Sequence, residues 1–192
     1  MIDSKLVMEL RAQTGAGVLE AKKALEETAG DIAKAIEQLR KSGALKAAKK
    51  SDRETCEGLV HAYIHGGGKV GVLVEVLCET DFVARNPEFE ALAHDLAMQI
   101  AATNPLYVKP EDVPSEMVEK EKAIYVEEVA GKPANIVEKI VKGKLDKWYS
   151  DVCLMRQAFI KDEDITIEDL IKSKIVKLGE NIQVRRFVRF AL

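Results

Sequence analysis

The sequence of 192 residues predicts an α+β fold, and two features of its apolar pattern lead to that prediction. Through residues 1–43, apolar side chains recur at the spacing of helices that bury one face. From Glu57 the period becomes two, in segments that flank a run of glycines, as in a β-hairpin. We expect a body in which helices pack on a small antiparallel sheet of about three strands.

The chain is expected to divide into three parts. Residues 1–43 are predicted to form a module of three helices. Residues 44–55 are rich in lysine and poor in apolar bulk, and are predicted to be a linker that is partly helical. Residues 56–192 form the α+β core domain.

Start and stop signals place the three helices of the N-terminal module. Asp3 or Ser4 can cap the first helix, and Asp31 can cap the third. The second helix is expected at about residues 18–28. Gly43 is expected to end the third helix.

The hairpin and the helix after it are the clearest elements. Segments 57–65 and 70–78 are predicted strands, joined by the glycines 66–68. One face of the second strand is formed by Val70, Val72, Val74, Val76 and Cys78. Asn86 can then cap a helix with Pro87 at its first position. The buried side of that helix is expected to carry Phe89, Leu92, Ala93, Leu96 and Ile100.

Two helices are expected in the middle of the chain. Ser115 is expected to cap a charged helix that reaches about Ala130, and Pro133 is expected to open the next. On the second of these helices, the side chains expected to point inward are those of Ile136, Val137, Ile140 and Val141.

The C-terminal part is predicted to contain a short helix and a strand. The helix spans 167–178 and ends at Gly179. The strand that follows should place on one face Ile182, Val184, Arg186, Val188 and Phe190. Residues 147–160 receive no assignment.

Composition excludes several classes of protein. The net charge of −3 argues against a dedicated nucleic-acid binder, so we expect no direct contact with nucleic acid. No apolar run is long enough to cross a membrane, and the first residues do not resemble a signal peptide. The three cysteines are isolated, which fits a reducing cytoplasm.

No catalytic constellation is evident. The segment HGGGK at 65–69 lacks the partners of an oxyanion loop or a phosphate loop, and is interpreted as a hairpin turn. His61 and His65 would lie roughly 13 Å apart on a strand, too far to share one metal ion. Cys78 and His94 could form a thiol–imidazole pair, but Cys78 belongs to the buried face of its strand. We therefore expect no enzyme, no metal site and no cofactor.

Two groups of basic residues could contact phosphates, or could serve solubility or contact with another protein. They are Lys46, Lys49 and Lys50 near the linker, and Arg185, Arg186 and Arg189 in the last strand.

The connection TDFVARN at 80–86 is unusual, because it places Phe82 and Val83 where a chain should face water. Phe82 could fill the core of its own fold, contributing about 1.5–3 kcal/mol. Alternatively, it could be a rigid aromatic anchor that inserts into a partner.

Four segments resemble the elongation factor Ts family, the nucleotide-exchange factors of bacterial translation, in order along nearly the whole chain. They are LRAQTGAGVLEAKKALEETAGDIAKAIEQLRKSG (10–43), CETDFVARN (78–86), QAFIKD (157–162) and GENIQVRRFVRF (179–190). The length is similar to that of compact members of the family.

The resemblance implies two surfaces that bind elongation factor Tu, a GTPase. One is a ubiquitin-associated-like N-terminal module, in which Arg11, Val18 and Leu19 match contact positions, although Leu19 could equally be core. The other is the tip that displaces Mg²⁺ from the partner, formed here by Thr80, Asp81, Phe82, Val83, Ala84 and Arg85. The resemblance also implies pairing of the chain with a second copy as a homodimer.

Two other functions remain open from the residues alone. The chain could be an adaptor whose N-terminal module binds ubiquitin-like or other small partners. It could also be a hydrolase that depends on Cys78, an interpretation that the missing constellation disfavours.

Overall fold

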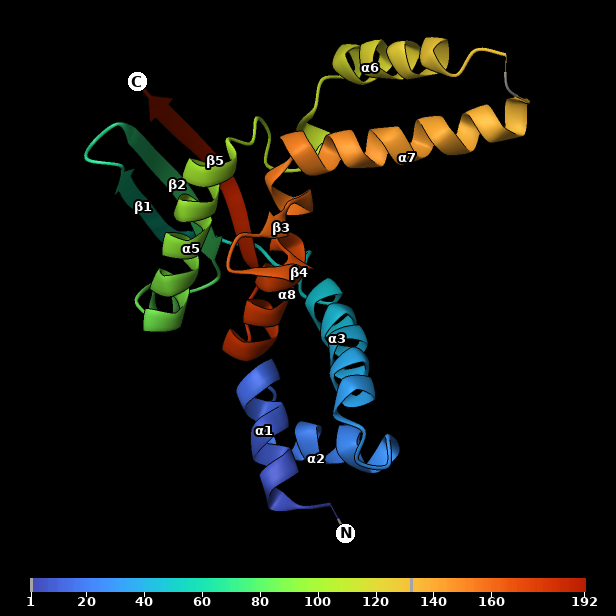
Figure 1. Cartoon of the computed structure of the whole chain (residues 1–192). Coiled ribbons are helices and arrows are strands. Elements are labelled where there is room, and N and C mark those ends of the chain that lie inside the picture. The colour runs from blue at the N-terminus through green and yellow to red at the C-terminus, as the bar shows by residue number, and fades with distance from the viewer. Residues whose placement is uncertain (1, 132) are drawn as a thin grey trace. The chain divides into compact units, whose positions relative to one another are not determined.

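The computed structural model of the protein describes residues 2–131 and 133–192 (Figure 1). The observed fold is α+β, as predicted. The chain separates into two compact units, each assembled from distant segments. Unit 1 comprises Met1–Leu59, Val76–Leu92 and Asp169–Gln183, and unit 2 comprises Val60–Glu75, Ala93–Glu168 and Val184–Leu192.

The helices and strands follow one another in a mixed order. The helices are α1 (Ser4–Thr14), α2 (Val18–Glu27), α3 (Ile32–Ala48), α4 (Asp81–Ala84), α5 (Pro87–Thr103), α6 (Ser115–Glu128), α7 (Ala134–Val152) and α8 (Ile167–Leu178). Two 3₁₀ turns are η1 (Pro110–Asp112) and η2 (Leu154–Arg156). The strands are β1 (Glu57–His65), β2 (Val70–Cys78), β3 (Ala158–Phe159), β4 (Asp162–Thr166) and β5 (Ile182–Ala191).

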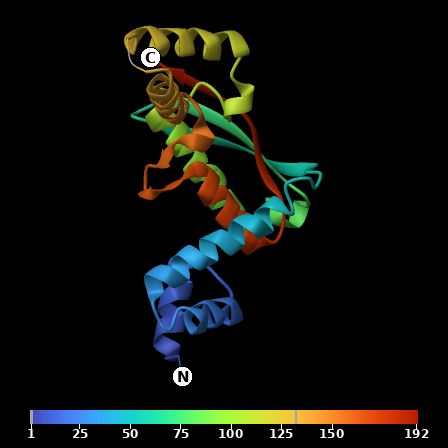
Figure 2. The same ribbon diagram turned by 90° about the vertical axis from the view of Figure 1, so that its right-hand side faces the viewer.

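The N-terminal module is confirmed as three helices, which pack on one another in unit 1 (Figure 2). Asp3 caps α1 by accepting a hydrogen bond from the backbone N–H of Lys5 at 3.0 Å. Asp31 caps α3 in the same way through the N–H of Lys34 at 3.1 Å. The small core of the module is formed by Val7, Leu10, Ala21, Ala24, Leu25 and Ala35.

The prediction that Gly43 ends the third helix is wrong, because α3 continues to Ala48. A glycine inside a helix costs about 1 kcal/mol relative to alanine, and the alanines and leucine that follow it favour helix. A Cβ at Gly43 would lie 3.6 Å from Val176, an ordinary van der Waals contact, so the packing of α8 does not require glycine at this position. The division into module, linker and core domain at 43 and 55 remains a prediction.

The main sheet is three-stranded, with the order β1-β2-β5. The predicted hairpin is confirmed, and its turn uses Gly66, Gly67 and Gly68 at positive φ, a region that glycine enters without strain. On β2 the predicted inward face is also confirmed, since its buried side chains are Val72, Val74, Val76 and Cys78. The helix that follows begins at Pro87, with the Asn86 side chain accepting from the N–H of Glu88 at 2.9 Å.

The strict alternation expected for β5 holds only for its first half. Ile182 is buried and Val184 is half-buried, but Arg185 and Arg186 are both exposed. From that point the less exposed positions are Phe187 and Arg189, while Val188 and Phe190 face solvent. Both arginines bind the carboxylate of Glu75, and Arg189 donates to the carbonyl of Ala101, so polar contacts accompany the change in the second half of the strand.

Unit 2 contains the helices α6 and α7, which lie beside each other (Figures 1 and 2). Pro114 rather than Ser115 occupies the cap position of α6, and no side chain caps that end. Pro133 precedes α7 as predicted. The expectation that Ile136 points inward is wrong, since it is 43% exposed in the first turn of α7. Val141, five residues further along the helix, is buried.

The short hairpin β3–β4 was not predicted, because its two-residue first strand is too short to show a period. A buried glutamine on α5 holds it in place. The side chain of Gln99 donates to the carbonyl of Ala158 at 3.0 Å and accepts from the N–H of Ile160 at 2.9 Å. Among the described residues, no helix is both long and apolar enough to cross a membrane.

Candidate functional site

The tip of the TDFVAR segment is a single helical turn, α4, between β2 and α5 in unit 1. Thr80 begins the turn with extended backbone, and its hydroxyl accepts from the N–H of Val83 at 3.4 Å. Phe82 is 84% exposed. The interpretation of Phe82 as part of its own core is therefore wrong, and the ring is presented to solvent.

A carboxylate from a distant part of the chain holds the base of this turn. Glu180 accepts hydrogen bonds from the backbone N–H groups of Glu79 and Thr80, at 3.1 and 3.0 Å, and from the Thr80 hydroxyl at 2.6 Å. We call these three hydrogen bonds the Glu180 clamp. Hydrogen bonds to an ionised acceptor are roughly twice as strong as neutral ones, so the clamp fixes where the turn begins.

The neighbours of the clamp reinforce it. The N–H of Asn181 donates to the Glu79 carboxylate at 2.6 Å. The buried side-chain amide of Asn181 donates to the carbonyls of Ser51 and Arg53, at 3.1 and 2.8 Å. The segment after α3, the residue after β2 and the residue before β5 are thus tied together within unit 1.

Sequence reasoning did not identify Glu180 or Asn181 as functional. The only sequence signal was their place in the segment 179–190 that resembles the family. Nothing local in the sequence indicates that a residue 100 positions away binds Thr80.

The remaining tip residues are exposed or half-buried. Asp81 and Arg85 form an ion pair at 3.0 Å between exposed side chains. An exposed i,i+4 pair is worth only about 0.3–0.5 kcal/mol, so either side chain can exchange its partner at low cost. Val83 and Ala84 are half-buried below them.

The start of α5 is fixed to α8 by a second carboxylate. Glu88 binds the ammonium groups of Lys174 at 2.6 Å and Lys177 at 2.7 Å. Hydrogen bonds from Lys174, which has the larger effect, and from Lys177 lower the pKa of Glu88 from 4.5 to about 2. The two ends of the segment that carries Phe82 are therefore anchored within unit 1, one by hydrogen bonds to Glu180 and the other by the ion pairs of Glu88.

The thiol beside the tip is not arranged for catalysis. Cys78 is buried, and its Sγ donates to the carbonyl of Thr80 at 3.2 Å. Burial, aided by the nearby Glu180 charge, raises the pKa of this thiol from 9.0 to about 11, which keeps it protonated near neutral pH. His94, the base considered for it, instead contacts His61. The thiol–imidazole interpretation therefore has no support in the structure.

The three N-terminal residues selected by resemblance lie on α1 and α2. Leu19 is 82% exposed, so its alternative interpretation as core is wrong, and Val18 beside it is also exposed. Arg11 is exposed and donates through Nε to the carbonyl of Ala16 at 3.2 Å, in the loop that leads into α2. Met8 on α1 is a further exposed apolar residue that sequence reasoning missed.

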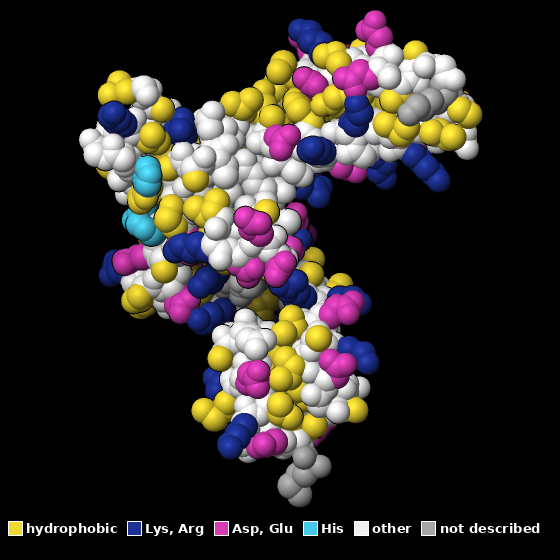
Figure 3. Space-filling view, viewed as in Figure 1, with side chains coloured by type: hydrophobic (Ala, Val, Ile, Leu, Met, Phe, Trp, Pro, Cys, Tyr) yellow, Lys and Arg dark blue, Asp and Glu magenta, His cyan; other side chains and the backbone are white. Residues whose placement is uncertain are grey.

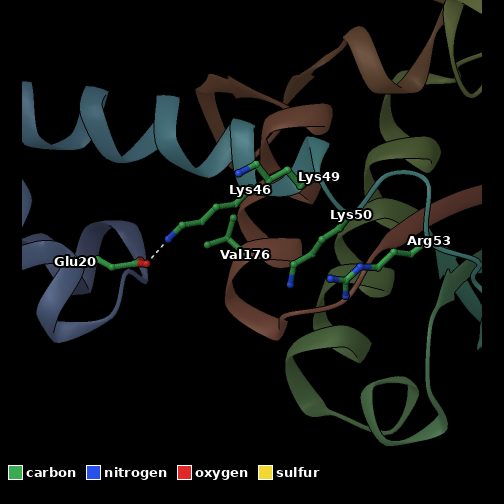
Figure 4. Close-up of a pocket in the computed structure, with 6 residues that line it drawn as sticks. All are labelled: Glu20, Lys46, Lys49, Lys50, Arg53 and Val176. Atoms are coloured by element: carbon green, nitrogen blue, oxygen red, sulfur yellow. Dashed lines mark hydrogen bonds and ion pairs between the residues drawn. The ribbon is translucent and has the colours of Figure 1, made fainter.

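The basic residues near the linker line a hollow of about 280 Å³ in unit 1 with Glu20 and Val176 (Figure 4). The hollow is lined by four cations, Lys46, Lys49, Lys50 and Arg53, and three of them have internal partners. Lys46 pairs with Glu20, Lys50 donates to the carbonyl of Gly179, and Arg53 lies 3.5 Å from the Glu79 carboxylate. These contacts connect α3 and the residues that follow it with their neighbours in unit 1, which disfavours phosphate binding.

The arginines of β5 are also engaged within their own unit. Arg185 and Arg186 bind Glu75 at 2.9 and 2.6 Å. Hydrogen bonds from Arg186, which has the larger effect, and from Arg185 lower the pKa of Glu75. Arg189 donates to the carbonyl of Ala101 at 3.2 Å.

Comparison with known proteins agrees with these motifs. The family model described as elongation factor TS matches residues 5–192. The elongation factor Ts of Carboxydothermus hydrogenoformans is 58% identical over all of this chain and 89% of the relative. That of Thermosipho melanesiensis is 56% identical over all of this chain and 99% of the relative. That of Thermotoga petrophila is 54% identical over all of this chain and 96% of the relative.

Each of these matches spans both units and includes the tip and the clamp. Identity above half over the full chain length is far more than a shared fold requires. This chain belongs to the elongation factor Ts family.

Proposed function

We propose that this translation elongation factor is a guanine-nucleotide exchange factor for elongation factor Tu. It binds the GDP-bound form, displaces Mg²⁺ and promotes GDP release and GTP loading in the cytoplasm. The process uses binding energy alone, so the protein is not an enzyme of covalent chemistry. The observation that supports this proposal best is the exposed Phe82 on a turn anchored by the Glu180 clamp.

The physical problem for an exchange factor is the tightness of the nucleotide site. A nanomolar site corresponds to about 12 kcal/mol, so spontaneous release of GDP is slow. Inserting Phe82 between partner helices near the metal would shift the groups that coordinate Mg²⁺. Loss of Mg²⁺ removes the largest positive charge opposite the β-phosphate, and GDP then leaves faster.

Thermodynamic linkage closes the cycle. If binding of this protein weakens GDP binding, nucleotide binding must weaken this protein by the same factor. Incoming GTP therefore expels it. Asp81 is proposed to hydrogen-bond the partner in the shifted state, after leaving its exposed pair with Arg85.

An anchored tip suits this task. A ring on a mobile loop would lose conformational freedom on insertion, and that cost would reduce the energy left to displace the metal. The Glu180 clamp orders the turn before binding, so more of the binding energy acts on the partner. The exposed residues Arg11, Val18 and Leu19 are proposed to dock the N-terminal module on the same partner.

Release of fluorescent GDP from elongation factor Tu, chased with unlabelled nucleotide at fixed Mg²⁺, tests the function. Substoichiometric wild-type protein should accelerate release, and Phe82→Ala should reduce the acceleration roughly tenfold or more, as for a hot spot worth about 2 kcal/mol. Leu106→Ala, a truncation of another exposed apolar residue outside the tip, is the matched control. A wild-type protein without effect on release would overturn the proposal and favour the adaptor function.

Pairing with a second copy stays a prediction, and unit 2 offers a candidate surface. Ile64 covers Gly71, so it shares with Leu73 the face of the sheet opposite the buried valines of β2. Across the three strands β1, β2 and β5, the large exposed apolar residues are Val60, Ile64, Leu73, Val188 and Phe190. Sedimentation equilibrium should show a dimer that Ile64→Lys dissociates, whereas a monomer at all concentrations would exclude pairing.

A further inference from the structure

All three histidines of the chain gather in unit 2, although they are distant in sequence. His61 and His65 lie on β1, and His94 lies on α5. The Nε2 atom of His61 is 3.2 Å from the Nδ1 atom of His94, and the two rings meet edge to face at 5.3 Å between centroids. Neither ring is buried, and histidine side chains reach the surface in Figure 3.

The spacing of the two facing nitrogens is that of two ligands on one metal ion. With bonds of about 2.0–2.1 Å and tetrahedral angles, two imidazole nitrogens on Zn²⁺ lie roughly 3.3 Å apart. In the metal-free pair, one nitrogen must carry the proton that the other accepts. A cation that replaces the proton lies to one side of the line between the two nitrogens, so both rings turn toward it while the distance between the nitrogens stays almost the same.

The rings are supported so that the arrangement is ready before binding. The ring of Tyr63 meets His94 edge to face at 5.4 Å and stacks with His65 at 5.8 Å. Its hydroxyl lies 2.9 Å from Nδ1 of His65, which occupies that histidine. The two ligands come from regular elements, His61 from the strand β1 and His94 from the helix α5, and the backbone of neither element can move freely.

We propose that His61 and His94 form a binding site for a divalent transition-metal cation. Imidazole ligands select Zn²⁺, Cu²⁺ or Ni²⁺ over Mg²⁺ and Ca²⁺, which prefer oxygen. Within the described part of the chain, no group of three or more acidic, cysteine or histidine side chains is placed to hold a metal. Water therefore completes the coordination, and the bound metal is exchangeable.

The bound cation would link an edge strand to a helix. β1 lies at one edge of the sheet, where the backbone of a strand lacks a partner on one side. A bond from His61 through the metal to His94 would fasten this edge to α5. Because the ion binds only the folded arrangement, it would raise the thermal stability of the protein.

Titration calorimetry with Zn²⁺ on protein without a histidine tag tests the proposal. All variants carry Cys56→Ser, because Cys56 is an exposed thiol that could bind zinc by itself. One Zn²⁺ per chain is expected, and His61→Ala and His94→Ala should each weaken binding by at least about tenfold, or 1.4 kcal/mol. His65→Ala is the matched control and should bind Zn²⁺ like the parent protein.

Two results would overturn the proposal. One is the absence of Zn²⁺ binding to the parent protein at millimolar metal, and the other is equal binding by all three histidine variants. The variants change side chains that are not buried, and far-ultraviolet circular dichroism verifies that they fold. Stabilisation by Zn²⁺ in thermal unfolding, lost in His94→Ala and kept in His65→Ala, is an independent readout. The measurement needs no partner protein, so its outcome does not depend on the exchange function.

Discussion

Phe82 and Phe89 lie on successive helices of unit 1, yet their environments are opposite. Phe82, on the single turn α4, is 84% exposed, whereas Phe89, in the first turns of α5, is 0% exposed. The helix α5 is long enough to bury a continuous apolar side, while α4 buries no residue at all. The longer helix is held by apolar burial, and the short turn is held by hydrogen bonds to Glu180.

The difference shows how a protein can keep a large apolar side chain both ordered and accessible. Burial would order Phe82 but hide it from a partner. Polar anchoring of the backbone below it orders the turn and leaves the ring free. Substitutions in the two regions should therefore separate stability from activity, with a loss of stability that is largest at Phe89 and smallest at Phe82.

Truncation of the buried ring should have the largest effect on stability. Phe89→Ala removes a fully buried aromatic side chain, which typically costs about 3–5 kcal/mol through lost burial and the cavity left behind. Chemical denaturation should show a much lower midpoint with an unchanged slope. A loss below about 1 kcal/mol would contradict the contrast with Phe82, because it would mean that burial does not hold α5.

Removal of the clamp should have an intermediate effect on stability and a clear one on exchange. Glu180→Ala leaves the N–H groups of Glu79 and Thr80 without their acceptor, at a cost of about 1.5–3 kcal/mol. GDP release should also slow, although Phe82 is intact, because the turn is no longer preorganised.

Glu180→Gln is the matched control for the clamp. Its amide oxygen still accepts hydrogen bonds from the backbone, so exchange should be recovered in part. If Glu180→Ala exchanges nucleotide like wild type at a temperature where it is folded, preorganisation of the tip is not needed.

Loss of the Glu88 contacts should have a smaller effect that depends on pH. The folded pKa of about 2 lies below the unfolded value of 4.5, so the stabilisation is complete above pH 4.5 and disappears as the pH falls toward about 2. The side chains are partly exposed, so Glu88→Gln should cost about 1 kcal/mol or less at neutral pH and low salt.

Thermal unfolding of Glu88→Gln and wild type across this pH range measures the effect. The difference between them should shrink with acid and with added salt. A difference that grows as the pH falls would have the wrong sign and would exclude this pair as its cause.

Truncation of the exposed ring should have almost no effect on stability. Phe82→Ala removes a side chain that faces solvent, and such changes are usually within about 0.5 kcal/mol. Its thermal unfolding should match that of wild type even though GDP release slows. A strong loss of stability would mean that Phe82 packs against its own fold in solution.

Features with local signals were predictable from the sequence. The caps Asp3, Asp31 and Asn86, the glycine turn and the alternation in β2 depend on residues that are neighbours along the chain. The tip was predicted by its motif, with two apolar residues where the chain should face water. The helix end predicted at Gly43 was wrong because the residues after it favour helix, and the alternation predicted for β5 fails where burial follows contacts with distant segments, such as that of Arg189 with Ala101.

By itself, the sequence determined the class of fold, the hairpin, the amphipathic helices and the motif that carries Phe82. Periodicity and capping are short-range, so each segment contains the information that specifies it. Only the tertiary structure decided that Glu180 holds Thr80 and that His94 meets His61, contacts between residues 100 and 33 positions apart. Such pairs arise because folding brings together segments that are far apart in the sequence. The position of two residues along the chain does not reveal how close they lie in the folded protein.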